Sequence, residues 1–253
     1  RVKEDVVADL PEKIEDTVMA QLTGEQRKLY LANQDRIAQQ VQHREASEFK
    51  KDKLKVLAEL TKLRQICCDP RLHYEDYKAG SAKLDTCMEL VYGALDGGHR
   101  ILLFSQFTGM LDIIGKRLAK EDIAFLKLTG ASSKESRAKM VAQFQAGEVP
   151  VFLISLKAGG VGLNLTAADV VIHYDPWWNV AAQDQATDRA HRIGQQHAVT
   201  VYKLIAKDTI EERIMQMQES KRDLVNSVLG GDGISSALFT REDVLALLGG
   251  DGR

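Results

Sequence analysis

The chain has 253 residues, of which 44% are hydrophobic and 28% are charged, and its formal net charge is −2. This balance is typical of a soluble globular protein and excludes a chain that is basic throughout, so any nucleic-acid contact must come from a local basic surface. No apolar run approaches the length of a membrane span. The N-terminus is charged, has no apolar h-region and lacks an initiator Met, so we expect an excised fragment of an intracellular protein.

The three cysteines are expected to be reduced, buried thiols. Cys67 and Cys68 are adjacent, which is not the spacing of zinc ligands, and no Cys/His pair elsewhere supplies it. With Cys87 the count is odd, which argues against a disulfide framework. The sequence therefore predicts no metal site in this chain.

Residues 1 to about 80 are rich in Lys, Glu, Gln, Leu and Ala and contain little Gly, a composition that favours helices. Apolar residues recur at helical spacing from Leu54 to Cys67. Asp69 and Pro70 should end that helix, because the residue before a proline avoids the α region. The basic residues along it are more typical of a solvated helix face than of a specific DNA site.

From about Ser81 to Ala206, short β-prone runs alternate with amphipathic stretches. The runs occupy residues 101–104, 125–128, 151–154, 170–173 and 199–202, and helices are expected over residues 109–120 and 133–145. This alternation predicts an α/β fold with a parallel sheet covered by helices. Ligands of such sheets bind in the loops at the carboxyl ends of the strands.

The last region, residues 207–253, is predicted to be a long helix followed by a tail. Thr209 and Glu212 have the spacing of a capping box. An apolar stripe at residues 210, 214, 217, 224 and 228 is more typical of a packing face than of a cofactor site. Residues 230–233 should end the helix, and one more short capped helix is expected between Thr240 and Leu248.

Two loops after predicted strands carry the candidate chemistry. Residues 159–162 contain three glycines, which would let the backbone approach a phosphate closely, although such loops are often only tight turns. Further on, Gln185, Arg189 and Arg192 would share one face of a helix. Arginine suits phosphate oxygens and the charge that develops in phosphoryl transfer. The alternative is a surface helix whose arginines pair with Asp184 or Asp188.

The segment between these loops, DPWWN at residues 175–179, contains both tryptophans of the chain. Aromatic side chains in a loop could stack on bases or sugars, or they could fill a gap beneath their own loop. No Gly-x-x-x-x-Gly-Lys-Ser/Thr occurs anywhere, and no acidic box suited to magnesium follows a buried strand. Arginines without a phosphate cradle indicate half of an ATPase site.

Residues 155–164, 175–179 and 185–195 (QATDRAHRIGQ) resemble motifs V and VI of Swi/Snf-type ATPases, DNA translocases of helicase superfamily two. Further segments that resemble the family in order and spacing are residues 6–13, 63–70 (with Asp69 for the usual His), 100–107 (motif IV) and 128–130. The resemblance covers nearly the whole chain. The short ending is more similar to bacterial members than to large eukaryotic remodellers.

This resemblance implies that residues 81–206 are the second RecA-like lobe. A helical linker or protrusion at residues 1–80 would precede it, and a brace helix with a C-terminal tail at residues 207–253 would follow it. ATP and Mg²⁺ would be held mainly by a first lobe that this chain lacks, so the chain alone should not hydrolyse ATP. Arg189 and Arg192 match the arginine fingers. Gly162, Asn164 and Gln185 match nucleotide-side positions, although Asn164 stands where many relatives have Asp. The positions that match DNA-backbone contacts are Ser105, Gln106, Lys157, Ala158 and Trp178.

The implied partners are double-stranded DNA, the first motor lobe and a DNA-bound protein complex of unspecified kind. The competing hypotheses are a strand-separating helicase, a stand-alone nucleotide-binding enzyme that uses the glycine loop, and a pure interaction module. The glycine loop lacks the spacing of a dinucleotide fingerprint. The residues between the two arginines argue against the usual RNA-helicase form.

Overall fold

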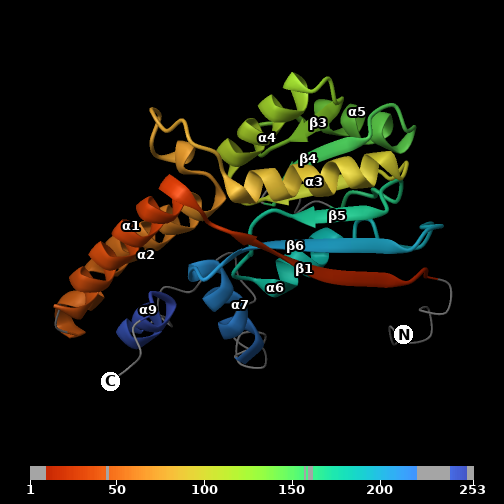
Figure 1. Cartoon of the computed structure of the whole chain (residues 1–253). Helices are drawn as coiled ribbons and strands as arrows, with labels where there is room; N and C mark the ends of the chain where they lie inside the picture. The colour runs from red at the N-terminus through yellow and green to blue at the C-terminus, as the bar shows by residue number, and fades with distance from the viewer. Residues whose placement is uncertain (1–9, 44–45, 157, 159–161, 221–239, 250–253) are drawn as a thin grey trace, which may run out of the picture. The chain divides into compact units, whose positions relative to one another are not determined.

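The computed structural model describes residues 10–43, 46–156, 158, 162–220 and 240–249. The chain forms two compact units, which are treated separately below (Figure 1). The sheet unit comprises Arg1–Val18, Cys87–Asp175 and Ala181–Leu204, and the helical unit comprises Met19–Thr86, Pro176–Val180 and Ile205–Arg253. The chain therefore leaves the sheet unit for five residues, 176–180, directly after Asp175.

The sheet unit is built on a six-stranded sheet with the order β1-β6-β5-β2-β4-β3. The strands are β1 (Lys13–Gln21), β2 (Ile101–Ser105), β3 (Phe125–Leu128), β4 (Val151–Ser155), β5 (Val170–His173) and β6 (Val199–Lys207). The pairings from β3 across to β6 are all parallel. Every residue of β2, β4 and β5 is buried, as expected of strands covered on both faces. The predicted α/β class and its five strands are confirmed.

Helices cover both faces of this sheet. Leu102 and Phe104 of β2 point to the same face, because side chains alternate along a strand. On this face they share a core with Phe144 of α5 (Lys134–Gln145) and Ala186 of α6 (Val180–Thr187). On the other face α4 (Thr108–Lys120) lies so close that a Cβ on its Gly115 would be 3.7 Å from Leu153. In Figure 1, α3 (Ala82–Asp96) crosses in front of the strands. Both helices expected between the strands are thus confirmed.

The helical prediction is wrong for Lys13–Gln21, which forms the edge strand β1. The backbone N–H of Val199 donates to the carbonyl of Glu12 (2.9 Å), and the Lys203 ammonium lies 2.7 Å from the Glu15 carboxylate. Helix propensity is a weak preference that non-local pairing overrides. Most of the strand is exposed, and its charged side chains are typical of a protected sheet edge.

The helical unit packs α1 (Gly24–Gln42) against α2 (Ala46–Cys68), with α7 (Ile210–Ser220) and α9 (Arg241–Leu247) contributing to the same core. The buried apolar residues of α2 include Phe49, Val56 and Leu60, whereas Leu54 is 75% exposed. The helix ends at Cys68 as predicted, and Asp69 caps the short 3₁₀ helix Pro70–Leu72. Cys67, Cys68 and Cys87 are all buried.

The C-terminal region agrees with the sequence only in part. Thr240 caps α9 in a capping box with Asp243, which confirms that short helix. At α7 the expected box is shifted, because Glu212 accepts from the N–H of Asp208 (2.7 Å) and the Thr209 hydroxyl accepts from the N–H of Glu211 (3.2 Å). The expected helix positions 224 and 228 and the break at 230–233 lie outside the described residues. None of the described helices is long and apolar enough to cross a membrane.

Candidate functional site

The candidate site of the sheet unit lies at the carboxyl ends of β2, β4 and β5. Ser105 at the end of β2 pairs with Ser155 at the end of β4, and the N–H of Leu156 donates to the Ser105 carbonyl (3.1 Å). On the other side of β2, the N–H of Tyr174 donates to the Phe104 carbonyl (2.9 Å). The loops that carry the three motif segments therefore start side by side, where ligands of parallel sheets bind.

The buried carboxylate of Asp175 holds two of these loops together. The Ser105 hydroxyl donates to one oxygen of Asp175 (2.5 Å), and the Gln106 side-chain amide donates to the other (2.6 Å). Ser105 is fully buried and Gln106 is half-buried. Both residues, expected from the resemblance at the DNA backbone, thus use their side chains to fix the edge of the sheet; their contact with DNA stays a prediction.

The glycine loop is described only in part, because Lys157 and residues 159–161 lie outside the described residues. Ala158 is 5% exposed, and its carbonyl accepts from Arg137 (3.4 Å). Gly162 and Asn164 are exposed. A Cβ added at Gly162 would meet nothing within 4 Å, and the φ angle of this residue is not positive. Among the described residues there is therefore open space beside the Gly162 backbone, which a ligand could approach closely.

The arginines do not share a helix face, so this part of the sequence prediction is wrong. Helix α6 ends at Thr187, and Arg189 and Arg192 lie on the turns that follow it. If the helix continued, the carbonyls of Arg189 and Ala190 would accept from backbone N–H groups four residues on. They accept instead from the N–H of Leu165 (3.0 Å) and the side-chain amide of Gln195 (3.1 Å).

The two guanidiniums differ in environment. Arg189 is 4% exposed, and burial together with the nearby charge of Arg192 lowers its pKa. Arg192 and Gln185 are exposed. Among the described residues, no ion pair joins Arg192 to Asp184 or Asp188, which is the contact that a purely structural salt bridge would need. Two cationic forks and an amide suit a polyanionic ligand such as a phosphate chain.

A divalent cation fits these residues poorly. In the described part of the chain, no three His, Cys, Asp or Glu side chains lie close enough together to hold a metal ion. Magnesium takes oxygen ligands, commonly carboxylates, and the exposed side chains of this edge are guanidinium and amide groups. These exposed side chains therefore suit an anionic ligand better than a divalent cation.

A buried histidine supports the start of the arginine turn. His173 at the end of β5 is 1% exposed, and its Nε2 lies 2.9 Å from the hydroxyl of Thr187, the last residue of α6. Burial, with a smaller effect from the charge of Lys203, lowers the pKa of His173 to about 3. The Thr187 hydroxyl donates to the Gln183 carbonyl (3.3 Å), so the neutral ring donates from Nε2. His173 thus positions α6 without carrying charge.

Trp178 belongs to the helical unit, so it is considered apart from the residues above. It is half-buried and packs against the core of that unit. The Arg64 guanidinium lies 5.3 Å from the centre of its ring and also donates to the Pro176 carbonyl. Gln218 of α7 donates to the carbonyl of Trp177 as well. The tryptophan loop is therefore held by side chains from two helices of its own unit.

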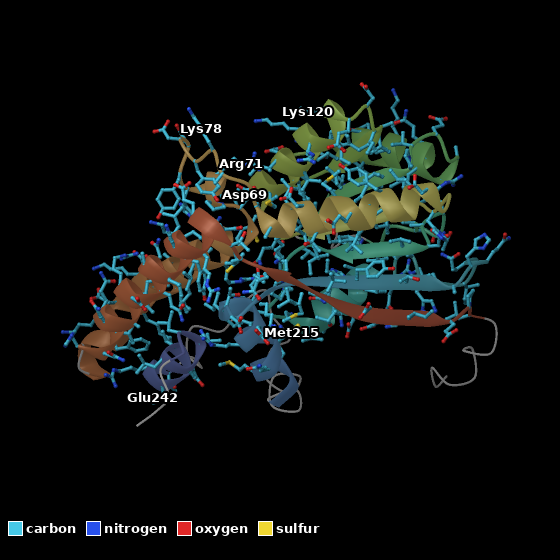
Figure 2. The ribbon with its side chains drawn as sticks, in the orientation of Figure 1. Asp69, Arg71, Lys78, Lys120, Met215 and Glu242 are labelled. Carbon is cyan, nitrogen blue, oxygen red and sulfur yellow. The ribbon has the colours of Figure 1, made fainter. Side chains whose placement is uncertain are left out.

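The change of His to Asp at position 69, relative to the family pattern, has a local compensation. Asp69 is completely buried and accepts two hydrogen bonds from the Arg71 side chain, at 2.9 and 2.6 Å. Both residues are labelled in Figure 2. Asp69 also caps the 3₁₀ turn at Pro70 by accepting from the N–H of Arg71.

Three residues with a defined structural role in or beside the site were not singled out from the sequence. Asp175, Arg64 and Gln195 each lie inside a family-like segment, but their partners are distant in sequence: Ser105, Pro176 and Thr166 respectively. The only sequence signal was the presence of an ionisable or amide side chain next to apolar positions within a motif.

Models of two known families match the chain. The Helicase conserved C-terminal domain matches residues 82–194, and the SNF2-related domain matches residues 1–72. An uncharacterized ATP-dependent helicase of Mycoplasma pneumoniae is 39% identical over 249 residues, which are 98% of this chain and 24% of the relative. The chain thus spans about a quarter of the length of this relative.

Solved structures of SWI2/SNF2 ATPases are similar over almost the whole chain. The C-terminal domain of the Sulfolobus solfataricus SWI2/SNF2 ATPase is 33% identical with a TM-score of 0.76, and the match covers 93% of this chain and 98% of that domain. The core of the same ATPase in complex with dsDNA is 35% identical with a TM-score of 0.78, over 96% of this chain and 52% of that one.

Proposed function

The chain belongs to the SWI2/SNF2 family of ATPases, and on that basis we propose that it is the second motor lobe of an ATP-dependent translocase of double-stranded DNA. The phosphate loop and the magnesium ligands would belong to a first lobe outside this chain. That division agrees with the residues at the carboxyl edge, which suit phosphates but not a divalent cation. Such a motor acts where DNA is, inside the cell.

The observation that carries this proposal is the link between the two candidate loops. The N–H of Leu165, next to Asn164, donates to the carbonyl of Arg189 (3.0 Å). The exposed Gly162 and Asn164 and the arginine turn therefore form one surface of the sheet unit. A surface that combines a close-approach glycine with exposed Arg192 is what one wall of a nucleotide site requires.

In this function Arg192 is the main arginine finger, and buried Arg189 supports it with a second positive charge. Phosphoryl transfer places charge on the transferred group in the transition state, where a guanidinium stabilises it more than in the ground state. Gly162, Asn164 and Gln185 would line the nucleotide side of the same wall. Bound ATP would supply the phosphoryl group, and Mg²⁺ would neutralise part of the negative charge of its phosphates.

The proposed DNA contacts address the sugar–phosphate backbone. They are made by Ser105, Gln106, Lys157, Ala158 and Trp178. The structural neighbour that was solved with dsDNA supports a duplex ligand. Contacts of this kind carry no base information, so binding should be indifferent to the DNA sequence. Binding should also weaken as the salt concentration rises, because the release of counterions from the DNA then favours it less.

The test replaces Arg192 in the protein that contains both motor lobes. Arg192→Ala should lower DNA-stimulated ATP turnover by about 10³–10⁵-fold while the melting temperature and DNA affinity stay close to those of the parent. Arg192→Lys should recover little, because a point charge cannot reproduce the planar fork. Arg117→Ala is the control and is expected to leave turnover unchanged, since Arg117 of α4 pairs with Glu121, the residue directly after that helix.

Two outcomes would contradict the proposal. If Arg192→Ala melts early but turns over normally when folded, the arginine is structural. If the isolated 253-residue chain hydrolyses ATP when DNA is added, the division of the site between two lobes is wrong. Strand separation by the complete protein, measured beside triplex displacement, would favour the helicase alternative over translocation on duplex DNA.

A further inference from the structure

Gln195, the last residue of the QATDRAHRIGQ segment, is a hydrogen-bonding centre of the sheet unit. It is 6% exposed. Its side-chain N–H groups point to the carbonyls of Ala168 (2.7 Å), Ala190 (3.1 Å) and Thr166 (3.2 Å). Its side-chain oxygen accepts from the N–H groups of the next two residues, Gln196 (2.8 Å) and His197 (3.0 Å). All of the polar capacity of the amide is therefore used within the protein.

These partners come from two segments that the nucleotide wall depends on. Thr166 and Ala168 belong to the stretch that begins at Asn164, and Ala190 follows Arg189 directly. The N–H of Gln195 itself donates to the carbonyl of Arg192 (2.9 Å). Gln195 thus contacts the stretch after Asn164 with its side chain, and it closes the arginine turn with both its side chain and its backbone.

The bond to Ala190 also explains why α6 does not continue. The carbonyl of Ala190 lacks the N–H partner that a further helical turn would provide, and a buried carbonyl without a donor costs about 1–3 kcal/mol. Gln195 supplies that donor, and Gly194, with φ of 103°, allows the reversal that brings it back. The non-helical path of the arginines therefore depends on this amide together with the N–H of Leu165, which binds the carbonyl of Arg189.

We propose that Gln195 is a positioning residue that sets the two arginines against the stretch after Asn164 and so determines the turnover rate of the motor. Gln195 contacts neither nucleotide nor DNA in this scheme; it acts only through the backbone carbonyls that it binds. The inference rests on the arginine role proposed above. Because displacement of a catalytic group by about 1 Å can lower a rate about 10²-fold, a loosened arginine turn should be visible in turnover.

The discriminating variant is Gln195→Glu, which keeps the shape and the oxygen that Gln196 and His197 bind. It removes both N–H donors and places a carboxylate against three carbonyl oxygens. The matched control is Gln145→Glu in α5. Gln145 accepts from the N–H of Ala167 (2.9 Å) and donates to the Thr166 hydroxyl (3.3 Å). A hydroxyl can reverse its role and donate to the new carboxylate, whereas a carbonyl cannot.

In the two-lobe protein, we expect Gln195→Glu to lower kcat about 10²-fold, with the KM for ATP and the DNA affinity within about twofold of the parent. Gln145→Glu should stay within about threefold in kcat. In the 253-residue chain, Gln195→Glu should increase hydrogen exchange at the Leu165 amide, which donates to Arg189. Adding Gln195→Glu to Arg192→Ala should cause a smaller further loss of turnover than the loss of about 10²-fold expected in the parent, because Gln195 then acts through Arg189 alone.

Three results would overturn the inference. The first is normal kcat in Gln195→Glu while Arg192→Ala abolishes turnover, which leaves the proposed function intact. The second is an equal loss in Gln145→Glu, or a loss that follows the unfolded fraction, since either would mean general destabilisation. The third is an undiminished further loss of about 10²-fold when both changes are combined, which would show that Gln195 acts elsewhere. If Arg192→Ala itself retains turnover, the proposed function fails instead, and the protection of Leu165 still reports whether Gln195 holds the turn.

Discussion

Replacing Lys83 with methionine should destabilise the helical unit by about 3–5 kcal/mol, the usual cost of leaving one charge of a buried ion pair without its partner. The ammonium of Lys83 lies 2.5 Å from the Glu211 carboxylate, and both side chains are completely buried. Methionine fills nearly the same volume as the lysine stem, so little of the cost comes from a cavity. Glu211 would keep its hydrogen bond from the N–H of Ala206 (2.9 Å), but its charge would be uncompensated.

The assay is urea unfolding of the 253-residue chain combined with hydrogen exchange of the α7 amides. The second measurement is needed because a chain of two units need not unfold in one transition. The control is Lys127→Met, which removes an ion pair whose side chains are 40% and 51% exposed and should cost less than about 1 kcal/mol.

A double change separates the charge effect from general damage. In Lys83→Met with Glu211→Gln, the glutamine oxygen can still accept from Ala206 while no buried charge remains. The double variant should therefore recover at least about 2 kcal/mol relative to the sum of the single changes. A single-variant cost below about 1 kcal/mol, or strict additivity, would refute the reasoning.

Two further predictions concern buried groups. Burial lowers the pKa of His173 to about 3, whereas a histidine in the unfolded chain has a pKa near 6.5. As the pH falls below 6.5, the unfolded chain therefore binds a proton that the folded chain does not. The free energy of unfolding should then fall by up to about 1.4 kcal/mol per pH unit between pH 6.5 and about pH 3, and should be unaffected by His173 above pH 6.5. His173→Phe should flatten that part of the stability curve measured by urea unfolding, and an unchanged slope would assign it to another group. In a Trp177→Phe background, Arg64→Met should expose the Trp178 ring, which would be seen as stronger acrylamide quenching of its fluorescence. Arg64→Lys should expose the ring less. Equal quenching in the background protein and in both Arg64 variants would show that Arg64 does not hold the ring.

The strands and helices with strong local signals could be predicted from the sequence. The segments 101–104 and 151–154 are short, β-prone and wholly apolar. Segments of this kind usually form buried parallel strands. Thr240 and Asp243 cap α9 through contacts within one turn. In each case the determining interaction lies within a few residues, so periodicity and capping chemistry are sufficient.

The path of the arginine turn depends on contacts distant in sequence. Gln185, Arg189 and Arg192 have helical spacing, yet the helix ends at Thr187 because Leu165 and Gln195 bind the carbonyls that it would need. The same holds for Lys13–Gln21, where helix-favouring residues pair with β6 as a strand.

The sequence by itself determined the fold class, the candidate loops and the residue types of the proposed nucleotide wall. Only the tertiary structure decided which arginine is buried, that Ser105 and Gln106 bind Asp175, and that the tryptophan loop is held in the helical unit. The physical reason is that a local pattern specifies propensities of at most about 1 kcal/mol per residue. A buried polar group without a partner costs more than that, so distant hydrogen bonds override the local preference wherever the two disagree.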